Sequence, residues 1–390
     1  MRRHAIELGR PPSVLRLVLV TLGILAVVVA VGVASPMAAS AHTAANSPAS
    51  NYVSRITAIV PAPKTFTAHV IEAGSRIELR WLSGPNIVVL DYDANPYLRI
   101  GPSGVEENLE SNAVYLNRNR LGSSPLPEGL HPDGPPKWHR VSSTPTARWH
   151  DHRIHWMLAS LPPTVKGRTG SAHLVQKWDI ALTQGTSSQG TTSYAISGDL
   201  RWVPGPSPFP LLLLALALAS CIVAFALFRR RSTTGRSTTG RSATERPTTN
   251  HHALGSAVVG GLLIALLVVD AVHLFGIAFG IRSGAGAAFG RVASVGFVSI
   301  IMWVVAVVAV MLLWRGRADA LYLVTLCAAV ITFVGGLSDL TVLSRTSVPF
   351  AWGVGVARLC VAATLGLGVG VAVAGVLLTR PAPRPRPKSP

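Results

Sequence analysis

The chain has 390 residues, of which 49% are hydrophobic and only 13% charged, and its formal net charge is +18. Soluble domains carry about 25% charged residues, so the composition excludes an ordinary soluble protein and predicts segments in contact with a lipid bilayer. A basic surplus is also typical of proteins that bind nucleic acid. Here, however, the arginines flank apolar runs, where they set topology, and no zinc-finger or RNA-binding signature is present. We therefore expect a membrane protein with no nucleic-acid partner.

The N-terminus has the pattern of an export signal. Several arginines precede an apolar stretch over residues 17–34, and Ala39-Ser40-Ala41 provides the small residues of a cleavage site. Cleavage there removes residues 1–41 as a signal peptide and leaves His42 as the first residue of the mature chain. The apolar stretch is long for a signal peptide, so an uncleaved anchor is the alternative.

Residues 42–205 are predicted to form an exported all-β domain. Short runs rich in β-branched and aromatic residues alternate with Gly, Pro, Asn and Ser, which is typical of an antiparallel sandwich of the immunoglobulin-like kind. This region has no cysteine, so its stability depends on its own core without a disulfide. Its Pro-rich stretch 121–136 predicts a long loop. The expected strands are 54–60, 66–72, 76–81, 86–91, 97–100, 138–141, 147–150, 173–182 and 193–202.

The rest of the chain is predicted to be an α-helical transmembrane bundle interrupted by a basic linker. The first helix is expected over 209–228, followed by a linker over 229–253 that repeats Arg-Ser-Thr-Thr-Gly and has too little apolar surface to fold. A four-helix transmembrane region over 254–378 and a Pro/Arg tail over 379–390 complete the chain. The spans expected in that region are 254–280, 292–314, 320–337 and 350–378.

The arginine clusters predict the orientation of the chain in the cell membrane. If the β domain lies outside, the arginines at 229–231 and 315–317 and those of the tail all fall on the cytoplasmic side. The sequence therefore predicts a multi-pass protein with the linker and the C-terminus in the cytoplasm.

The densest group of metal-binding side chains lies within the segment Trp149–Met157. In an extended strand His150 and His152 share one face, so they could give two imidazoles to one metal ion, with Asp151 as a ligand or as the carboxylate that orients them. The alternative is a strand whose polar side chains hydrogen-bond and pack in the core. A mature N-terminal His42 would add an α-amine and an imidazole, a nitrogen set that suits Cu(II), unless the cleavage site precedes a histidine by chance.

The start at His42 and the cysteine-free β domain beside a membrane bundle resemble the copper-resistance families CopC and CopD. The resemblance implies a copper site on an immunoglobulin-like sandwich, with His42 as the first ligand and Asp151 and His152 as candidates for the others. The chain departs from these families in its longer β region and in having fewer spans and fewer histidines. Other motifs resemble multi-pass membrane proteins of actinobacteria with an exported β domain, which implies architecture more than function; these motifs are Tyr97–Pro102, Tyr115–Asn117 and Trp149–Trp156.

Ionisable residues also occur within the predicted bundle. Asp270 and His273 are three residues apart and therefore share one face of a helix, and Asp339 and Arg358 are the expected partners. Charged groups inside a bilayer are costly, so they are usually paired or functional. The sequence leaves two interpretations open, a polar clamp that holds the bundle together and an ion or proton path.

The sequence contains no Gly-x-Ser-x-Gly elbow, phosphate-binding loop or His-Glu-x-x-His motif, so we do not expect an enzyme. The leading hypothesis is a membrane-anchored extracytoplasmic protein that handles or senses a metal, with copper as the expected ion. The alternative is a non-catalytic structural or interaction module of the cell envelope that binds no metal. The sequence does not identify a protein partner.

Overall fold

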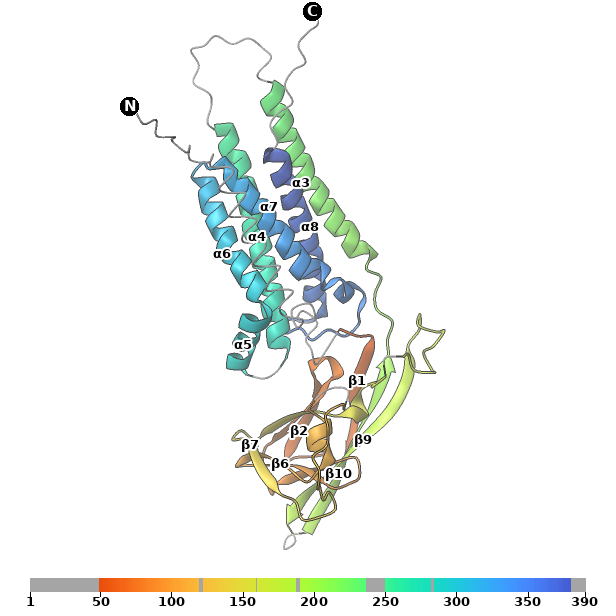
Figure 1. Ribbon diagram of the computed structural model, residues 1–390. Helices are drawn as coiled ribbons and strands as arrows, with labels where there is room; N and C mark the ends of the chain where they lie inside the picture. The colour runs from red at the N-terminus through yellow and green to blue at the C-terminus, as the bar shows by residue number, and fades with distance from the viewer. Residues whose placement is uncertain are drawn as a thin grey trace, which may run out of the picture.

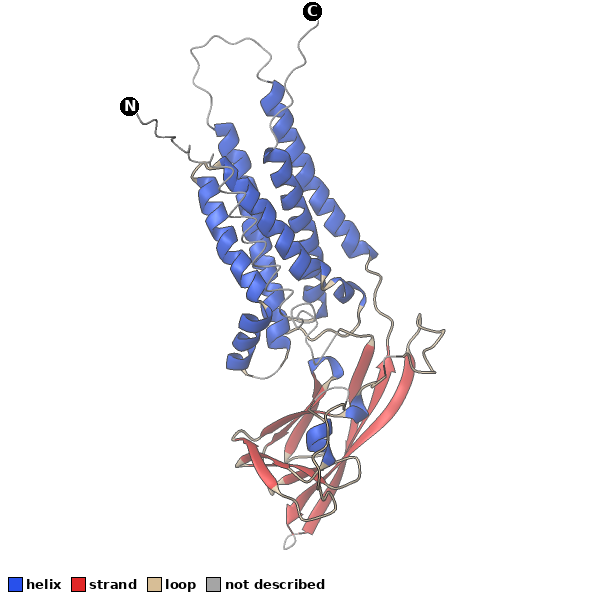
Figure 2. Ribbon diagram, in the orientation of Figure 1, coloured by secondary structure: helices blue, strands red, loops and turns tan. Residues whose placement is uncertain are grey.

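A computed structural model describes residues 49–118, 122–158, 160–186, 190–235, 250–281 and 284–379. The predicted signal peptide, His42, most of the predicted linker and the tail beyond residue 379 lie outside the described residues. A β domain forms one end of an elongated molecule and a bundle of helices forms the other (Figure 1, Figure 2). The predicted combination of an antiparallel β domain and membrane-spanning helices is therefore confirmed.

The β domain consists of two antiparallel sheets. In the described residues, one sheet has seven strands in the order β1-β10-β9-β4-β5-β6-β7 and the other has three in the order β2-β3-β8. Every predicted strand is present, with ends that match the prediction or differ from it by a few residues. The strands are β1 (Tyr52–Val60), β2 (Phe66–Ile71), β3 (Arg76–Trp81), β4 (Ile87–Leu90), β5 (Pro96–Gly101), β6 (Gly104–Asn108), β7 (Trp138–Ser142), β8 (Thr146–His150), β9 (His173–Thr186) and β10 (Gly190–Trp202).

Side chains from both sheets form one apolar core. In β3 the buried Ile77 and Leu79 alternate with the more exposed Arg76 and Glu78, as the two-residue period of a strand requires. Burying each large aliphatic side chain contributes about 1.5–3 kcal/mol, so the domain can be stable without a disulfide. The core also contains Phe66, Ile87, Val89, Ile100, Ala147, Trp149, Ile180, Leu182 and Ile196.

One strand and one α-helix of the β domain were not predicted from the sequence. The first is β6, whose acidic residues disfavour a strand in isolation. Glu106 on β6 accepts a hydrogen bond of 2.6 Å from Arg99 on the paired strand β5, and this cross-strand contact stabilises the pairing. The second is the short helix α2 (Asn112–Leu116), which begins where the Ser111 side chain accepts a hydrogen bond from the Ala113 amide.

In the described chain, five helices are long and apolar enough to cross a membrane. α8 lies at the centre, in contact with α3, α4 and α7, whereas α6 packs against α4 and α7. The ends of α3 and α8 and the start of α4 lie together, away from the β domain (Figure 1). The elements are α3 (Phe209–Gly235), α4 (Asn250–Gly280), α6 (Phe297–Trp314), α7 (Leu321–Ile331) with its π-helical continuation η4 (Thr332–Leu337), and α8 (Val354–Thr379); η3 (Ala318–Ala320) and η5 (Leu340–Ser344) are short 3₁₀ helices.

The predicted span 292–314 begins five residues too early, because the helix breaks at Gly296 and the apolar helix that could cross a membrane covers Phe297–Trp314. α5 (Ala285–Val295) ends there and α6 begins at Phe297. A Cβ at Gly296 would lie 2.2 Å from Leu274 Cδ2, so glycine allows close packing against α4 at the break. Arg291 holds α5 beside the end of α4, because its Nη2 donates to the carbonyl of Ala278 at 2.7 Å. α5 therefore lies at the end of the bundle that faces the β domain (Figure 1).

α3 packs on α8 through small residues. A Cβ at Gly366 of α8 would lie 2.8 Å from the carbonyl oxygen of Ala215, and one at Gly370 would lie 3.2 Å from the Cα of Ala219. Glycines four residues apart allow two helix backbones to approach closely. In a bilayer the hydrophobic effect does not drive helices together, so the dispersion contacts of such close packing stabilise their association. α3 follows β10 directly in the chain, so this contact also anchors the β domain to the bundle.

Candidate functional site at the junction of the two domains

The bundle meets the β domain through residues 339–350, which we call the strap. The strap leaves the bundle after η4, contains η5 and returns before α8. At its tip Ser347 forms an antiparallel bridge with Ser50, with hydrogen bonds of 2.8 Å in both directions. The Thr346 hydroxyl donates to the carbonyl of Val203 at 2.8 Å. The strap therefore contacts both the start of β1 and the chain that follows β10.

The connection between β10 and α3 crosses the strap closely. A Cβ at Gly205 would lie 1.7 Å from the carbonyl oxygen of Ser344, so a glycine is needed for the two backbones to pass. Nearby, the Asn51 side chain accepts a hydrogen bond of 3.1 Å from the Thr346 amide. A displacement of the β domain relative to the bundle would therefore disturb the strap at several points.

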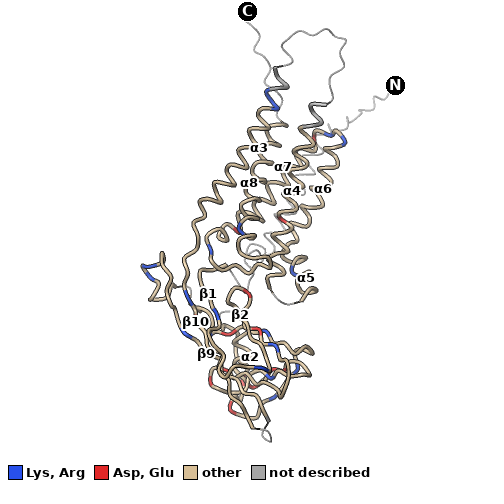
Figure 3. Tube along the Cα trace, turned by 180° about the vertical axis from the view of Figure 1, so that it is seen from behind, with Lys and Arg blue, Asp and Glu red and all other residues tan. Residues whose placement is uncertain are grey.

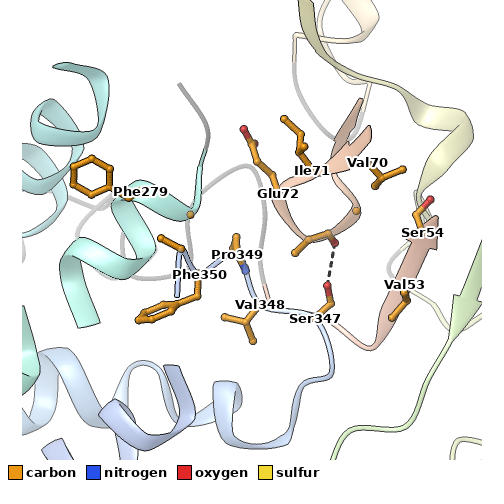
Figure 4. A pocket seen from close by; sticks show the side chains of 14 residues that line it. Val53, Ser54, Val70, Ile71, Glu72, Phe279, Ser347, Val348, Pro349 and Phe350 are labelled. Carbon is orange, nitrogen blue, oxygen red and sulfur yellow. Dashed lines mark hydrogen bonds between the residues drawn. The ribbon is translucent and has the colours of Figure 1, made fainter. Parts of the chain in front are cut away.

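On the β-domain side, the strap contacts a backbone turn in an unfavourable conformation. Glu72, Ala73 and Gly74 have φ values of 54°, 57° and 92°, all in the left-handed region. For residues other than glycine this region costs about 1–2 kcal/mol each, and such strain persists only where surrounding contacts impose it. One such contact is the hydrogen bond of 3.2 Å from the Ser347 hydroxyl to the carbonyl of Ala73 (Figure 4). Strained turns of this kind are concentrated at functional sites.

Charged side chains link this turn to strand β8. The buried carboxylate of Glu72 lies 3.4 Å from Arg76 Nε, which also donates to His150 Nε2 at 3.1 Å. Because Nε2 accepts from a guanidinium, the proton of a neutral imidazole is assigned to Nδ1, which lies 3.0 Å from the carbonyl of Ser75. His150 is thus a buried link between β8 and the junction.

A cavity of about 410 Å³ opens beside the strap (Figure 4). Its walls come from β1 and β2, from the left-handed turn, from the end of α4 and from the strap, so both domains contribute to it. Most of the lining side chains are apolar, including Phe279 and Val348, and Glu72 is the acidic one among them. The volume of the cavity depends on how the two domains are positioned.

Both ends of the strap return to the same histidine in α4. His273 is only 2% exposed, and its Nε2 lies 2.8 Å from the carboxylate of Asp339, where the strap begins. The Phe350 ring, where the strap ends, has its centroid 5.9 Å from the imidazole. Among the described residues, His273 Nδ1 has no hydrogen-bond partner. A change at His273 would therefore reach both ends of the segment that holds the β domain.

The other predicted intramembrane residues lie apart from this pair or have different partners. Asp270, also 2% exposed, accepts a hydrogen bond of 2.8 Å from Trp303 Nε1 on α6 and lies against the π-helical η4, where a Cβ at Gly335 would be 2.3 Å from its Oδ1. π-helical turns are frequent at functional sites. Arg358 donates from Nη2 to the carbonyl of Arg345 at 2.5 Å. The structure thus joins His273 with Asp339 and gives Asp270 and Arg358 separate contacts.

The extended conformation on which the His150–His152 metal pair depended does not continue past His150. β8 ends at His150, and His152–Ile154 forms the 3₁₀ turn η2, which begins at Asp151. The carboxylate of Asp151 is completely buried and accepts hydrogen bonds from Arg153 N, Nε and Nη2 and from Trp149 Nε1, at 2.8–3.1 Å. These local donors bend the chain and occupy both carboxylate oxygens.

The predicted metal ligands are therefore not gathered around one point. In the part of the chain that the structure describes, no group of three or more His, Cys, Asp and Glu side chains is placed to hold a metal ion. The turn brings a different pair together, because the rings of His152 and His155 lie 5.6 Å apart. The sequence signal for this pair was its spacing of three residues. In a strand, residues three apart point to opposite faces, whereas in a 3₁₀ turn they lie side by side. His42 lies outside the described residues.

Comparison with known proteins adds no family to this description. No family model, no curated protein and no solved structure matches the chain. The function is therefore argued from the geometry of the junction itself.

Proposed function

We propose that this protein is a non-catalytic sensing module of the cell envelope, in which the state of the β domain is transmitted to the membrane helices through the strap. The observation that carries the proposal is that one segment contacts His273 at both of its ends, through Asp339 and Phe350, and contacts the β domain at its tip, through Ser347. A purely structural anchor needs the contact at the tip but no buried polar pair at the base.

The strap and α3 form two routes between the domains. The strap runs from Ser347 to the His273 pair in the bundle, and α3 continues from β10 to its packing contact with α8. Communication between two sites is a coupling free energy and acts in both directions. A ligand that changes the β domain would shift the strap, and a change at His273 would loosen or tighten the docking of the β domain.

The proposal includes the orientation predicted from the arginines, with the β domain outside the cell and the far end of the bundle in the cytoplasm. It is supported by the lack of charge along most of the helices and by the basic residues at the far end of α3 (Figure 3). Cysteines at Ser103 and Ser389, in a chain without its native cysteines, provide the test. Only Ser103→Cys should react with an impermeant thiol reagent added outside, and external labelling of Ser389→Cys would exclude this orientation.

The β domain is further proposed to be related to immunoglobulin-like sandwiches. Two antiparallel sheets with a shared core support this relation, although the division into seven and three strands differs from that of an immunoglobulin constant domain.

Hydrogen exchange in the full-length protein in lipid nanodiscs tests the coupling. Asp339→Asn weakens the pair with His273, and losing such a buried contact costs about 1–3 kcal/mol, which corresponds to about a 5- to 150-fold change in an opening equilibrium. The amides of Ser50 and Ser347, which form hydrogen bonds across the junction, should exchange with solvent faster by the same factor. Asp319→Asn, in the loop at the other end of the bundle, is the matched control and should leave both amides unchanged.

The outcome separates a sensing module from a purely structural anchor. If Asp339→Asn folds normally and the amides of Ser50 and Ser347 exchange as in the wild type, the domains are not coupled and the proposed sensing through the strap is excluded. Copper handling is a second candidate function, and the approach of the His152 and His155 rings favours it.

A further inference from the structure

Two arginines meet at the end of the bundle that faces the β domain. Arg345 belongs to the strap, and Arg358 lies in α8, where its Nη2 donates to the carbonyl oxygen of Arg345 at 2.5 Å. Both residues are partly buried, and the Nε atom of each is closed off from the surface without a hydrogen-bond partner among the described residues. Buried donors are nearly always satisfied, so two neighbouring orphans indicate an acceptor from outside the described chain.

No acidic side chain of the bundle is available to this arginine pair. The described helices and the segments that connect them contain three acidic residues. Each is held by a partner other than these arginines: Asp270 by Trp303, Asp319 by Arg317 and Asp339 by His273. The pair therefore carries two positive charges that the surrounding helices do not balance. Such charge is costly at the edge of a bilayer, where water solvates it incompletely.

The position of Arg358 along its helix matches the level of lipid headgroups. α8 is apolar enough to cross a membrane over Val354–Thr379, and at a rise of about 1.5 Å per residue Arg358 lies only about 6 Å from the start of the helix. Trp352, just before the helix, is 50% exposed, and exposed tryptophans are concentrated where a bilayer meets water. We therefore expect the phosphate groups of the adjacent leaflet at the height of the two guanidinium groups.

The surface beside Arg358 has room for a headgroup and offers an apolar contact for an acyl chain. Gly355 precedes Arg358 by three residues and so shares its helix face, and a Cβ on Gly355 would meet no other atom within 4 Å. Leu359, the next residue of α8, is 53% exposed. A free phosphate ion would contact only the arginines, whereas a phospholipid would also cover Leu359. The arrangement therefore favours a lipid over a soluble anion.

We propose that Arg345 and Arg358 bind the phosphate group of an anionic phospholipid in the leaflet next to the β domain. Neither terminal nitrogen of Arg345 is closed off from the surface or bonded within the described chain, so both can donate to a headgroup. A guanidinium presents paired N–H groups that match phosphate oxygens, and these charge-assisted hydrogen bonds are stronger than neutral ones. The headgroup carries a net negative charge, because the cation of a choline headgroup would offset its own phosphate.

This lipid site goes beyond the sensing function and requires only that α8 cross the bilayer. Because Arg345 is part of the strap, a bound lipid would also hold the strap at the membrane surface. The next residue, Thr346, donates to the carbonyl of Val203 at 2.8 Å, so the same segment contacts the β domain. The site thus adds the bilayer itself to the contacts of the junction.

Native mass spectrometry of the full-length protein in detergent, titrated with phosphatidylglycerol, tests the site. The wild type should retain one phosphatidylglycerol molecule, and should hold it more tightly than phosphatidylcholine with the same acyl chains. Arg345→Gln and Arg358→Gln each remove one of the two charges and should weaken the retention of phosphatidylglycerol by at least about tenfold. Arg317→Gln removes an arginine that already pairs with Asp319 at the other end of the bundle, and this control should leave the affinity unchanged.

The comparison of lipids on the wild type decides the question even if a glutamine variant does not fold. Equal affinity for phosphatidylglycerol and phosphatidylcholine would overturn the site, as would wild-type affinity for phosphatidylglycerol in both glutamine variants. Competition with glycerol 3-phosphate distinguishes a lipid from a soluble anion. Retention of phosphatidylglycerol in an excess of glycerol 3-phosphate supports the lipid, whereas its displacement at equal concentrations would show that the arginines bind a soluble phosphate instead.

Discussion

The β domain and the helix bundle handle their polar side chains in opposite ways. In the β domain charged residues are frequent and most pair with an exposed partner, as when the buried Asp199 bonds to the exposed Arg55 and to Arg201 at 2.8–2.9 Å. In the bundle the helices are nearly free of charge between their ends, and the few polar side chains, such as Asp270 and His273, are buried (Figure 3). Exposed ion pairs contribute about 0–1 kcal/mol, whereas a polar group in a bilayer has no water to replace a lost partner.

Single polar contacts should therefore matter far more in the bundle than in the β domain. The junction between the domains is therefore the strongest candidate for a functional site. There the strap joins one buried polar pair, His273 and Asp339, to a β domain with many interchangeable surface contacts.

The largest effect is expected where two helix backbones touch. Gly366→Leu would place a Cβ 2.8 Å from the Ala215 carbonyl, and because the obstacle is backbone, α3 must move away from α8. Overpacking costs about 1–3 kcal/mol or more, so the melting temperature in detergent should fall by several degrees. Gly355→Leu, on the same helix with open space around it, is the control. Equal melting temperatures for the two variants would show that α3 does not pack closely on α8.

A smaller effect, and a more specific one, is expected from the buried pair. His273→Gln and Asp339→Asn should each lower the thermal stability in detergent, and the double variant should be non-additive by about 0.5–3 kcal/mol because the two side chains touch. Combining Asp339→Asn with Arg358→Leu should be additive, since Arg358 bonds to the carbonyl of Arg345. Non-additivity in the second cycle would restore the four-residue cluster predicted from the sequence.

Much of the architecture could be predicted from the sequence because the relevant signals are local. Runs such as Ile87–Leu90 and the turn residues between them indicate strands, and apolar length indicates spans. The acidic strand β6 was missed because its stability comes from Arg99 on the neighbouring strand. The break at Gly296 was missed because a glycine inside an apolar run is read as part of the helix.

The candidate sites depended on contacts that are not local. The His273–Asp339 contact was anticipated because ionisable residues in a bilayer need partners. The strap was not, since Thr346 and Asn51 are ordinary polar residues separated by 295 positions. The predicted metal strand failed for a local reason, because Arg153 folds back onto Asp151 and ends the strand. The same turn creates the His152–His155 pair, which a pattern of alternating strand residues does not reveal.

The smallest effects are expected at the surface of the β domain, where two adjacent residues of β6 should respond to pH in opposite directions. Burial raises the pKa of Glu107, although Arg118 and His139 oppose the shift. The hydrogen bond from Arg99 lowers the pKa of Glu106. For Glu107 the folded pKa lies above the unfolded value of about 4.3, so its contribution to stability is present at acid pH and is lost as the pH rises through the folded pKa. For Glu106 the contribution is present above about pH 4.3 and is lost as the pH falls.

Glu107→Gln should therefore raise the melting temperature of the β domain at pH 7, and Glu106→Gln should lower it. Both differences should be small, because pairs near the surface contribute only about 0–1 kcal/mol. Near pH 4 the gain from Glu107→Gln should disappear, since the wild-type carboxyl is then protonated and as neutral as the amide. Tryptophan fluorescence during thermal unfolding at the two pH values measures both variants in the full-length protein. If the two substitutions shifted the melting temperature in the same direction at pH 7, the contrast between a desolvated carboxyl and a paired one on this strand would be incorrect.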